Sequence, residues 1–151
     1  MSSIEIKVGN HLISDDPSRL DPVMIHRYLS EESYWAQGVT REIVDRSLKN
    51  SLCLGVYSEG SQIGLARVIT DSATFAWICD VFIISSHRGQ GLGKALIQAV
   101  MSHPNIQTVR RVALGTRDAH GLYEQFGFIP LAAPERQMEK RMASGDSTPV
   151  C

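Results

Sequence analysis

A short stretch of the chain, HRGQGLGKAL, places Gly89, Gly91 and Gly93 at alternate positions, with Arg88 before them and Lys94 after them. The residues that follow have helical spacing, so these glycines stand at the start of a helix. A helix start offers unpaired main-chain N–H groups and a positive dipole end, which favour a bound anion such as phosphate. Glycines let the main chain approach that anion closely because they lack Cβ atoms. The stretch predicts an anion-binding loop, or simply a turn that joins a strand to a helix.

Two common phosphate-binding motifs do not fit this stretch. The dinucleotide fingerprint G-x-G-x-x-G fails in both registers, because its last position falls on Lys94 or on Leu96. The P-loop G-x-x-x-x-G-K-[ST] fails twice, because Arg88 replaces its first glycine and Ala95 replaces its hydroxyl residue. That hydroxyl is the usual magnesium ligand, so its absence argues against nucleotide phosphoryl transfer.

The pattern that remains, R-x-x-G-x-G from Arg88 to Gly93, resembles the acetyl-CoA loop of the GNAT superfamily of N-acetyltransferases. A second stretch, LYEQFGF at residues 122–128, is similar to that family's L-Y-E-x-x-G-F signature and follows in the family's order. The resemblance covers roughly residues 63–128. It implies an α/β fold with a mixed, mostly antiparallel sheet, a central parallel strand pair and flanking helices. It also implies an enzyme that transfers an acetyl group from acetyl-CoA to a primary amine by direct attack, without a metal.

The resemblance further implies which residues bind the acyl donor. Main-chain N–H groups of the fourth strand hold the developing oxyanion, and the glycine loop holds the pyrophosphate, with two basic side chains adding point charges. Thr116 stands where the family often has an asparagine that contacts coenzyme A. A hydroxyl replaces only one of two amide hydrogen bonds, so this departure puts cofactor affinity in doubt. The cofactor-binding residues expected on this basis are Val81, Phe82, Ile83, Arg88, Gly89, Gln90, Gly91, Leu92, Gly93, Lys94 and Thr116.

Two residues are candidates for proton transfer. Tyr123 occupies the family's general-acid position, and an ordinary tyrosine pKa of about 10 keeps its proton at pH 7. Its ring could equally pack beneath the helix. Asp80 could relay a proton from the amine through water, or it could be turned away to pair with Arg67 or Arg117. His120 shares the approximate helix face of Tyr123 and is a base, a ligand contact or a solvated histidine.

The acceptor amine would bind where the family places its acceptor pocket, between the loop joining the first two helices and the end of the sheet. Tyr34 and Trp35 lie in that loop, and Trp77 and Cys79 lie in a predicted strand. Aromatic rings there can line an apolar or cationic amine site. The same four residues can also belong to the core.

A small set of elements must position these residues. Asp21 before Pro22 and Thr40 before a helical pattern are good helix caps. Three runs of β-branched and aromatic residues with short turns between them predict an antiparallel meander. A strand, helix and strand in succession around the glycine loop predict a parallel pair. The expected strands are 1–14, 52–57, 62–69, 74–84, 110–116 and a last antiparallel pair, 128–133 with 136–142; the expected helices are 22–29, 40–48, 92–103 and 118–126, the last stopped by Gly127.

Composition narrows the class of protein. A chain of 151 residues that is 43% hydrophobic and 21% charged fits one domain, expected at residues 1–142, with a polar, disordered tail at 143–151. A net charge of −1 argues against a nucleic-acid partner. Residues 81–117 nonetheless contain five basic residues and no acidic one, which suits a small, highly anionic ligand.

The remaining expectations concern location and partners. No apolar run is long enough for a signal peptide or a membrane span, so a cytoplasmic protein without a membrane partner is expected. The three cysteines show no metal-ligand spacing and are interpreted as core thiols, apart from Cys151 at the end of the chain. The expected partner is a small-molecule or peptide amine, and a homodimer is possible. The alternative function is a non-catalytic module that binds and senses acyl-CoA.

Overall fold

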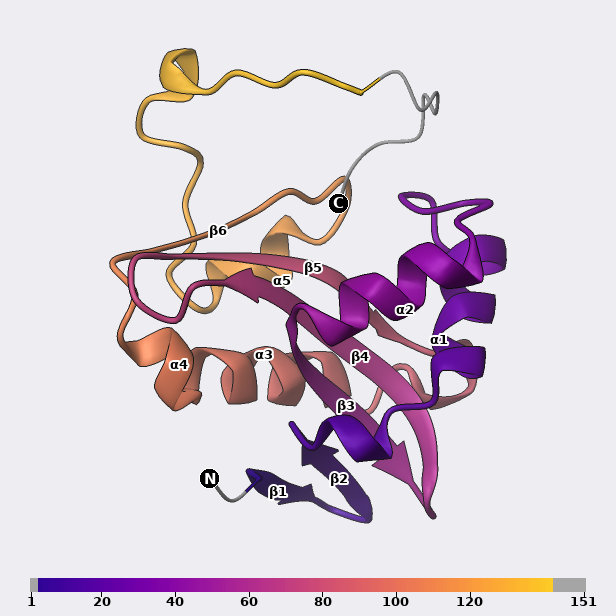
Figure 1. Ribbon diagram of the computed structural model, residues 1–151. Coiled ribbons are helices and arrows are strands. Elements are labelled where there is room, and N and C mark those ends of the chain that lie inside the picture. Colours follow the sequence, from indigo (N-terminus) through magenta and orange to yellow (C-terminus); the bar gives the residue numbers. More distant parts are fainter. Residues whose placement is uncertain (1–2, 143–151) are drawn as a thin grey trace.

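A computed structural model describes residues 3–142 of the chain (Figure 1). The strands are β1 Glu5–Val8, β2 His11–Ser14, β3 Leu52–Ser58, β4 Ser61–Thr70, β5 Phe75–Ile83 and β6 Arg111–Leu114. The helices are α1 Pro22–Arg27, α2 Arg41–Lys49, α3 Leu92–Ser102, α4 Pro104–Gln107 and α5 His120–Glu124. A π-helical turn, Tyr28–Glu32, continues α1, and 3-10 turns occur at Pro17–Arg19, Ser85–His87 and Pro134–Arg136.

The six strands form a single sheet in the order β1-β2-β3-β4-β5-β6. Neighbouring strands are antiparallel except β5 and β6, which are parallel. This confirms the predicted α/β fold with a mixed, mostly antiparallel sheet and one parallel strand pair. None of the helices in the described part of the chain is long and apolar enough to cross a membrane.

The helices begin at the expected caps. The Asp21 side chain accepts a hydrogen bond from the Met24 N–H, and the Thr40 hydroxyl accepts one from the Ile43 N–H. Each cap satisfies a main-chain donor that would otherwise have no partner inside its helix. At the other end of the chain, Gly127 has φ 86°, the left-handed conformation expected of a C-terminal stop.

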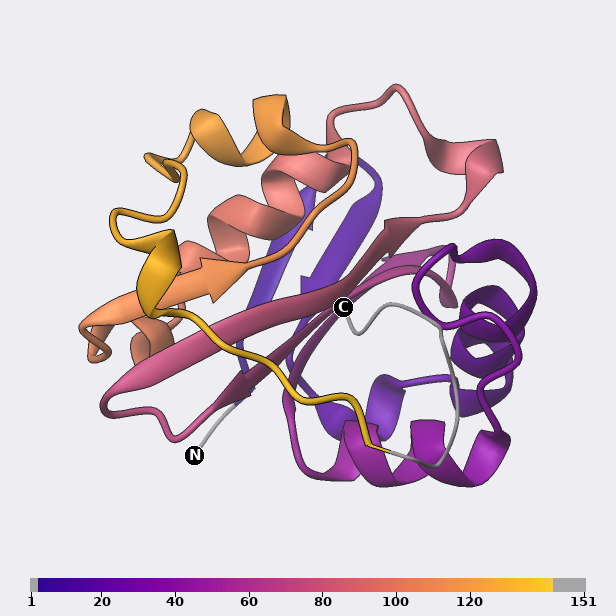
Figure 2. The ribbon, with the colours of Figure 1, turned by 90° about the horizontal axis from the view of Figure 1, so that it is seen from above.

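Helices cover both faces of the sheet (Figures 1 and 2). Two clusters of apolar side chains are buried between the sheet and these helices. On one face, α3 packs Leu92, Leu96, Ala99 and Val100 against the strands, as its spacing predicts. On the other face, α1 and α2 cover Cys53, Leu65 and Phe82. The Cys53 thiol is a core thiol as expected, and burial raises its pKa to about 12. Cys151 lies outside the described residues.

Two sequence-based expectations were wrong at the ends of the chain. The first strand is in fact a hairpin, β1 and β2, because Gly9 and Asn10 form a two-residue turn in which Gly9 has φ 59°.

The last antiparallel pair does not form: residues 128–142 contain one 3-10 turn and no strand. Pro130 and Pro134 lack the N–H donors of a strand ladder, which accounts for its absence. Figure 1 shows this segment, in yellow and orange, lying apart from the sheet, with Met138 97% exposed. The expected tail at 143–151 lies outside the described residues.

The strand β5 changes partners along its length. It pairs with β6 only from Phe75 to Ile78, and Figure 2 shows the chain after β6 turning away from β5. Beyond that point the register between β4 and β5 shifts, so that two residues, Asp80 and Val81, stand opposite Ala66. Asp80 has φ 49°, which is unusual for a residue other than glycine. This bulge and the divergence of β6 leave one edge of β5 open from Cys79 onward.

Candidate active site

The glycine loop connects β5 to α3 and presents a run of main-chain donors. Gly89 and Gly91 have φ 79° and 77°, left-handed conformations that glycine adopts without strain. The first helical hydrogen bond runs from the Ala95 N–H to the Gly91 carbonyl at 3.1 Å. Within residues 3–142, no protein acceptor faces the N–H groups of the six residues from Gly89 to Lys94. These six donors are available to an anion.

The space beside this loop is open. A Cβ atom added at Gly89, Gly91 or Gly93 would meet no protein atom within 4 Å. The packing of the protein therefore does not require the absence of side chains here, whereas a ligand seated against the main chain would. Gln90 and Lys94 are exposed beside the loop, and Leu92 turns into the core at 3% exposure. The residues present fit a bound pyrophosphate.

Arg88 does more than supply a charge. Its Nε donates to the Ile83 carbonyl at 2.8 Å, and a terminal nitrogen donates to the Tyr28 hydroxyl at 2.9 Å. The Tyr28 ring stacks on Phe82, with ring centroids 3.9 Å apart. Arg88 therefore ties the loop to the end of β5 and to the end of α1. From sequence, Arg88 was expected only to add a positive charge beside the pyrophosphate. The structure shows in addition that two hydrogen bonds fix the position of its guanidinium group.

The open edge of β5 leads from the loop to a cleft. The Ile84 N–H donates to the Ile63 carbonyl at 2.9 Å, and Ile83 pairs with Gly64. Because donors alternate along an antiparallel ladder, the Phe82 N–H faces β4 and the Ile83 N–H faces the open edge. Among the three oxyanion donors expected from sequence, Ile83 thus has its N–H on the open edge of β5, and Val81 lines the cleft to which this edge leads.

The cleft lies where β5 and β6 diverge and has a volume of about 480 Å³. Its wall is formed by the loop after the π-helical turn, by β5, by the segment that follows β6 and by α5. The lining residues are Tyr34, Trp35, Ile78, Cys79, Asp80, Val81, Gly115, Thr116, Arg117, Asp118, Ala119 and Tyr123.

Tyr123 projects from α5 into this cleft and is only 7% exposed. Burial, with smaller contributions from the nearby Tyr34 and Cys79, raises the pKa of Tyr123 to about 12. Its hydroxyl has no hydrogen-bond partner among residues 3–142, while its ring contacts Phe128 edge-on at 5.8 Å. The hydroxyl is therefore protonated at neutral pH and free to donate to a ligand in the cleft.

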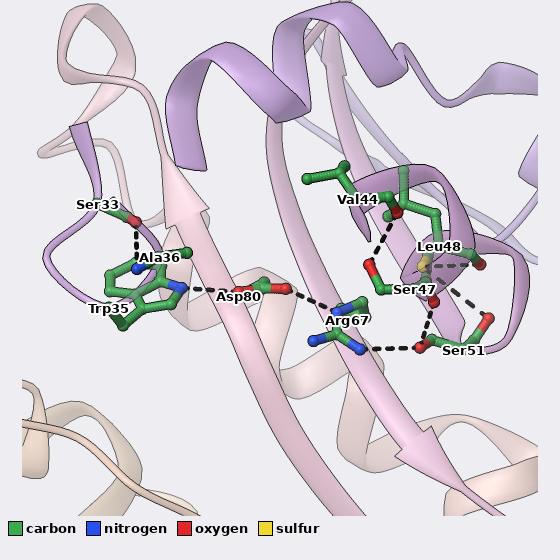
Figure 3. Close-up of polar contacts among 10 residues, drawn as sticks. Ser33, Trp35, Ala36, Val44, Ser47, Leu48, Ser51, Arg67 and Asp80 are labelled. Carbon is green, nitrogen blue, oxygen red and sulfur yellow. Dashed lines mark hydrogen bonds and ion pairs between the residues drawn. The ribbon is translucent and has the colours of Figure 1, made fainter. Parts of the chain in front are cut away.

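Asp80 lies in the floor of the cleft and is 6% exposed. One carboxylate oxygen accepts a hydrogen bond from Trp35 Nε1 and the other accepts one from Arg67 Nε, both at 2.7 Å (Figure 3). From sequence, Asp80 could either relay a proton through water or pair with Arg67 or Arg117. The structure shows the ion pair, with Arg67 as the partner. A second nitrogen of Arg67 donates to the Ser51 hydroxyl at 3.1 Å, which extends the network to the end of α2.

Arg117 meets Tyr34 rather than Asp80. Its guanidinium lies 3.8 Å from the centre of the Tyr34 ring, and its main-chain N–H donates to the Tyr34 hydroxyl at 3.0 Å. Tyr34 in turn contacts Trp35 edge-on, with centroids 5.0 Å apart. The contact between Arg117 and Tyr34 joins segments 83 residues apart, and no local sequence pattern indicated it.

Comparisons with known proteins agree with this arrangement. Residues 23–128 match the model of the acetyltransferase (GNAT) family. The chain belongs to the GNAT acetyltransferase family. It is 31% identical to a Gibberella zeae protein named as an acetyltransferase, over 76% of each chain. A solved structure from Xanthomonas campestris, assigned to the GNAT family, is 44% identical with a TM-score of 0.88, covering 94% of this chain and 100% of that one. A Deinococcus radiodurans structure at 16% identity, covering 97% of each chain with a TM-score of 0.71, shares the fold.

Several residues expected at the site of this GNAT acetyltransferase lie in the cleft. Tyr34, Trp35, Cys79 and Thr116 line the cleft. The Thr116 hydroxyl already accepts a hydrogen bond from the Ala119 N–H at 3.0 Å, so it holds the turn that precedes α5 as well as facing the cleft.

Trp77 is the exception among the expected acceptor-site residues, because it is not part of the cleft wall. It lies two residues before Cys79 on β5, beside Ala113 of β6. His120 is exposed and also lies outside the wall of this GNAT cleft. In the described part of the chain, no group of three His, Cys, Asp or Glu residues is arranged to hold a metal ion.

Proposed function

We propose that this GNAT protein transfers the acetyl group of acetyl-CoA to a primary amine. The observation that carries the proposal is that three features adjoin one another. The six main-chain donors at the start of α3 lie at one end of the open edge of β5, and the cleft that contains Tyr123 lies at the other end. The loop suits the pyrophosphate of coenzyme A, and the strand edge suits its extended pantetheine arm, which can lie there like an added strand.

The loop acts mainly through hydrogen bonds. A helix dipole contributes about 0.3–1 kcal/mol at an exposed site. Hydrogen bonds to a charged partner contribute roughly 1.5–3 kcal/mol each. A few of the six N–H groups therefore outweigh the dipole, and glycine at positions 89, 91 and 93 leaves room for the phosphate oxygens.

The cleft supplies the acid chemistry. Acetyl-CoA brings a thioester carbonyl, and the amine lone pair forms the new N–C bond at that carbon. The Ile83 N–H, on the open edge, donates to the oxygen that becomes an oxyanion. As the C–S bond breaks, Tyr123 gives its proton to sulfur and takes one from the attacking nitrogen, which carries an excess proton once the N–C bond has formed. A relay of this kind suits a tyrosine of pKa about 12, because no charge remains on its oxygen afterwards.

A thermal-shift titration tests the donor. We expect acetyl-CoA to raise the melting temperature, and ATP and NADH to leave it unchanged, because a ligand that binds only the folded state stabilises it by RT ln(1 + [L]/Kd). Thiol release in the presence of an amine panel then tests turnover. A larger shift with ATP would overturn the proposal, and binding of acetyl-CoA without turnover on any amine would leave a sensing module instead.

A further inference from the structure

The charges in the cleft cancel in pairs. Asp80 accepts hydrogen bonds from Arg67 and Trp35, and its side chain and that of Arg67 are 6% and 11% exposed. At the exposed rim of the cleft, Asp118 stands 3.5 Å from a terminal nitrogen of Arg117, and these side chains are 64% and 65% exposed. Among the described residues that line the cleft, no other aspartate, glutamate, lysine or histidine occurs. The lining and the arginine behind it therefore carry no net charge.

This balance bears on how an amine can enter. An ammonium group leaving water would find no unpaired carboxylate, and a charge buried without a partner is strongly unfavourable. The Arg117 guanidinium, held over the Tyr34 ring, would repel it. The other titratable groups that face the cleft are Tyr34, Cys79 and Tyr123, and Tyr123 stays protonated through neutral pH. The lining thus provides neither a counter-charge for an ammonium group nor an unpaired carboxylate or imidazole to remove its proton.

Resting on the N-acetyltransferase function proposed above, we propose that the Arg67–Asp80 pair selects an acceptor that enters uncharged: an amine of low basicity on a flat apolar body, of which an arylamine is the simplest. The walls suit such a body. Tyr34 and Trp35 present two rings at 84° to one another, and Asp80 fixes the Trp35 indole through its Nε1–H. Asp80 is then a positioning and specificity-determining residue, and its left-handed φ is held by hydrogen bonds to both carboxylate oxygens.

The test compares two acceptors that share one ring, aniline and benzylamine, with acetyl-CoA as donor. Aniline is uncharged at neutral pH, whereas benzylamine is largely protonated. Since no group in the cleft deprotonates the ammonium form before attack in this proposal, kcat/KM for benzylamine should rise about tenfold per pH unit between pH 6 and 8, following its uncharged fraction. The value for aniline should stay level over the same range. A level profile for benzylamine would overturn the proposal.

A variant then separates selection from mere stability. Arg67→Gln leaves the Asp80 charge without its partner, so the ratio of kcat/KM for benzylamine to that for aniline should rise about tenfold or more at pH 7. The double variant Arg67→Gln with Asp80→Asn removes both charges, and the ratio should return to the wild-type value. Breaking a buried ion pair is destabilising. If the single variant does not fold, the pH profiles of the wild-type enzyme still test the proposal. An unchanged ratio in a folded Arg67→Gln protein would overturn the proposal.

The outcomes distinguish this inference from the function on which it rests. If acetyl-CoA binds and neither amine is acetylated, nor any amine of a broader panel, the N-acetyltransferase function fails and the inference fails with it. If both amines are acetylated but the pH profiles and the ratio do not follow the expected pattern, the inference alone fails.

Discussion

The glycine loop and the acceptor cleft are built on opposite principles. The loop is contiguous, exposed and made of main chain, with six donors in a row and no side chain required. The cleft is assembled from segments between Tyr34 and Tyr123, has a buried floor and an exposed rim, and depends on side-chain pairs such as Arg67 with Asp80. A main-chain site of this kind recognises the pyrophosphate that every acyl-CoA carries. A site made of side chains can change its acceptor when one pair of side chains is substituted.

The largest expected effect comes from the cleft. Tyr123→Phe should lower kcat about a hundredfold or more, the scale of a lost general acid, because it removes only the hydroxyl. Binding of acetyl-CoA should not change, since the loop is untouched. Steady-state kinetics and a thermal-shift titration measure the two effects separately. Undiminished turnover would remove Tyr123 from the role of proton donor.

The loop should show the reverse pattern. Gly93→Ala should weaken acetyl-CoA binding about tenfold while raising helix stability, because the added Cβ meets no protein atom but approaches the phosphate. Gly91→Val should weaken binding further, since its φ of 77° is unsuitable for a β-branched residue. Calorimetric titration measures both affinities.

Gly60→Val is the matched control for backbone strain, because Gly60 has φ 81° and stands in the turn between β3 and β4. It should lose stability without a change in acetyl-CoA affinity. Equal affinities for wild type, Gly93→Ala and Gly91→Val would mean that no ligand approaches this main chain.

Arg88 joins the two regions and should show a smaller, mixed effect. Arg88→Lys keeps the charge but loses the two-pronged contact with the Ile83 carbonyl and the Tyr28 hydroxyl. We expect the free energy of unfolding to fall by about 1 kcal/mol per lost hydrogen bond. The affinity for acetyl-CoA should fall severalfold in a calorimetric titration. Tyr28→Phe is the control variant, because it removes only the contact between Arg88 and the Tyr28 hydroxyl. Full affinity in Arg88→Lys would show that charge alone matters at this position.

The smallest effect belongs to a turn outside both regions. Hydrogen bonds from the Thr74 hydroxyl and main chain, and from the Ala73 N–H, hold the pKa of Asp71 well below its ordinary value. A depressed carboxylate pKa adds stability above the ordinary pKa of about 3.9 and loses it as the pH falls. Asp71→Asn should thus be slightly less stable than wild type at pH 5, with the difference shrinking toward pH 2 in urea denaturation. Kinetic constants at neutral pH should be unchanged.

What could be predicted from sequence was what is local in the chain. The glycine loop, the caps at Asp21 and Thr40, and the apolar face of α3 each depend on residues a few positions apart. The parallel pairing of β5 with β6 followed from the order of the elements. The N-terminal hairpin is also local, and the two-residue Gly-Asn turn at residues 9 and 10 is the sequence signal for it.

The interior of the cleft depends on contacts that no local pattern encodes. Trp35 and Asp80 are 45 residues apart, and Arg67 and Ser51 are 16 apart. Their meeting depends on the bulge in β5, where Asp80 has a left-handed φ. Aspartate tolerates this conformation better than most residues, but a single aspartate inside an apolar strand does not by itself indicate a bulge. Sequence offered two partners for Asp80, and only the register of β4 against β5 separates them.

The divergence of β6 from β5 also has a consequence for solubility. A bare strand edge is normally a template on which other chains assemble into aggregates. Here the bare part of β5 begins at Cys79, inside the angle between two strands, and is kinked at once by the bulge at Asp80. A narrow ligand can reach such a recessed edge, but a strand that is already part of another sheet cannot. The same geometry that admits a substrate thus makes this edge a poor template for a strand of another chain.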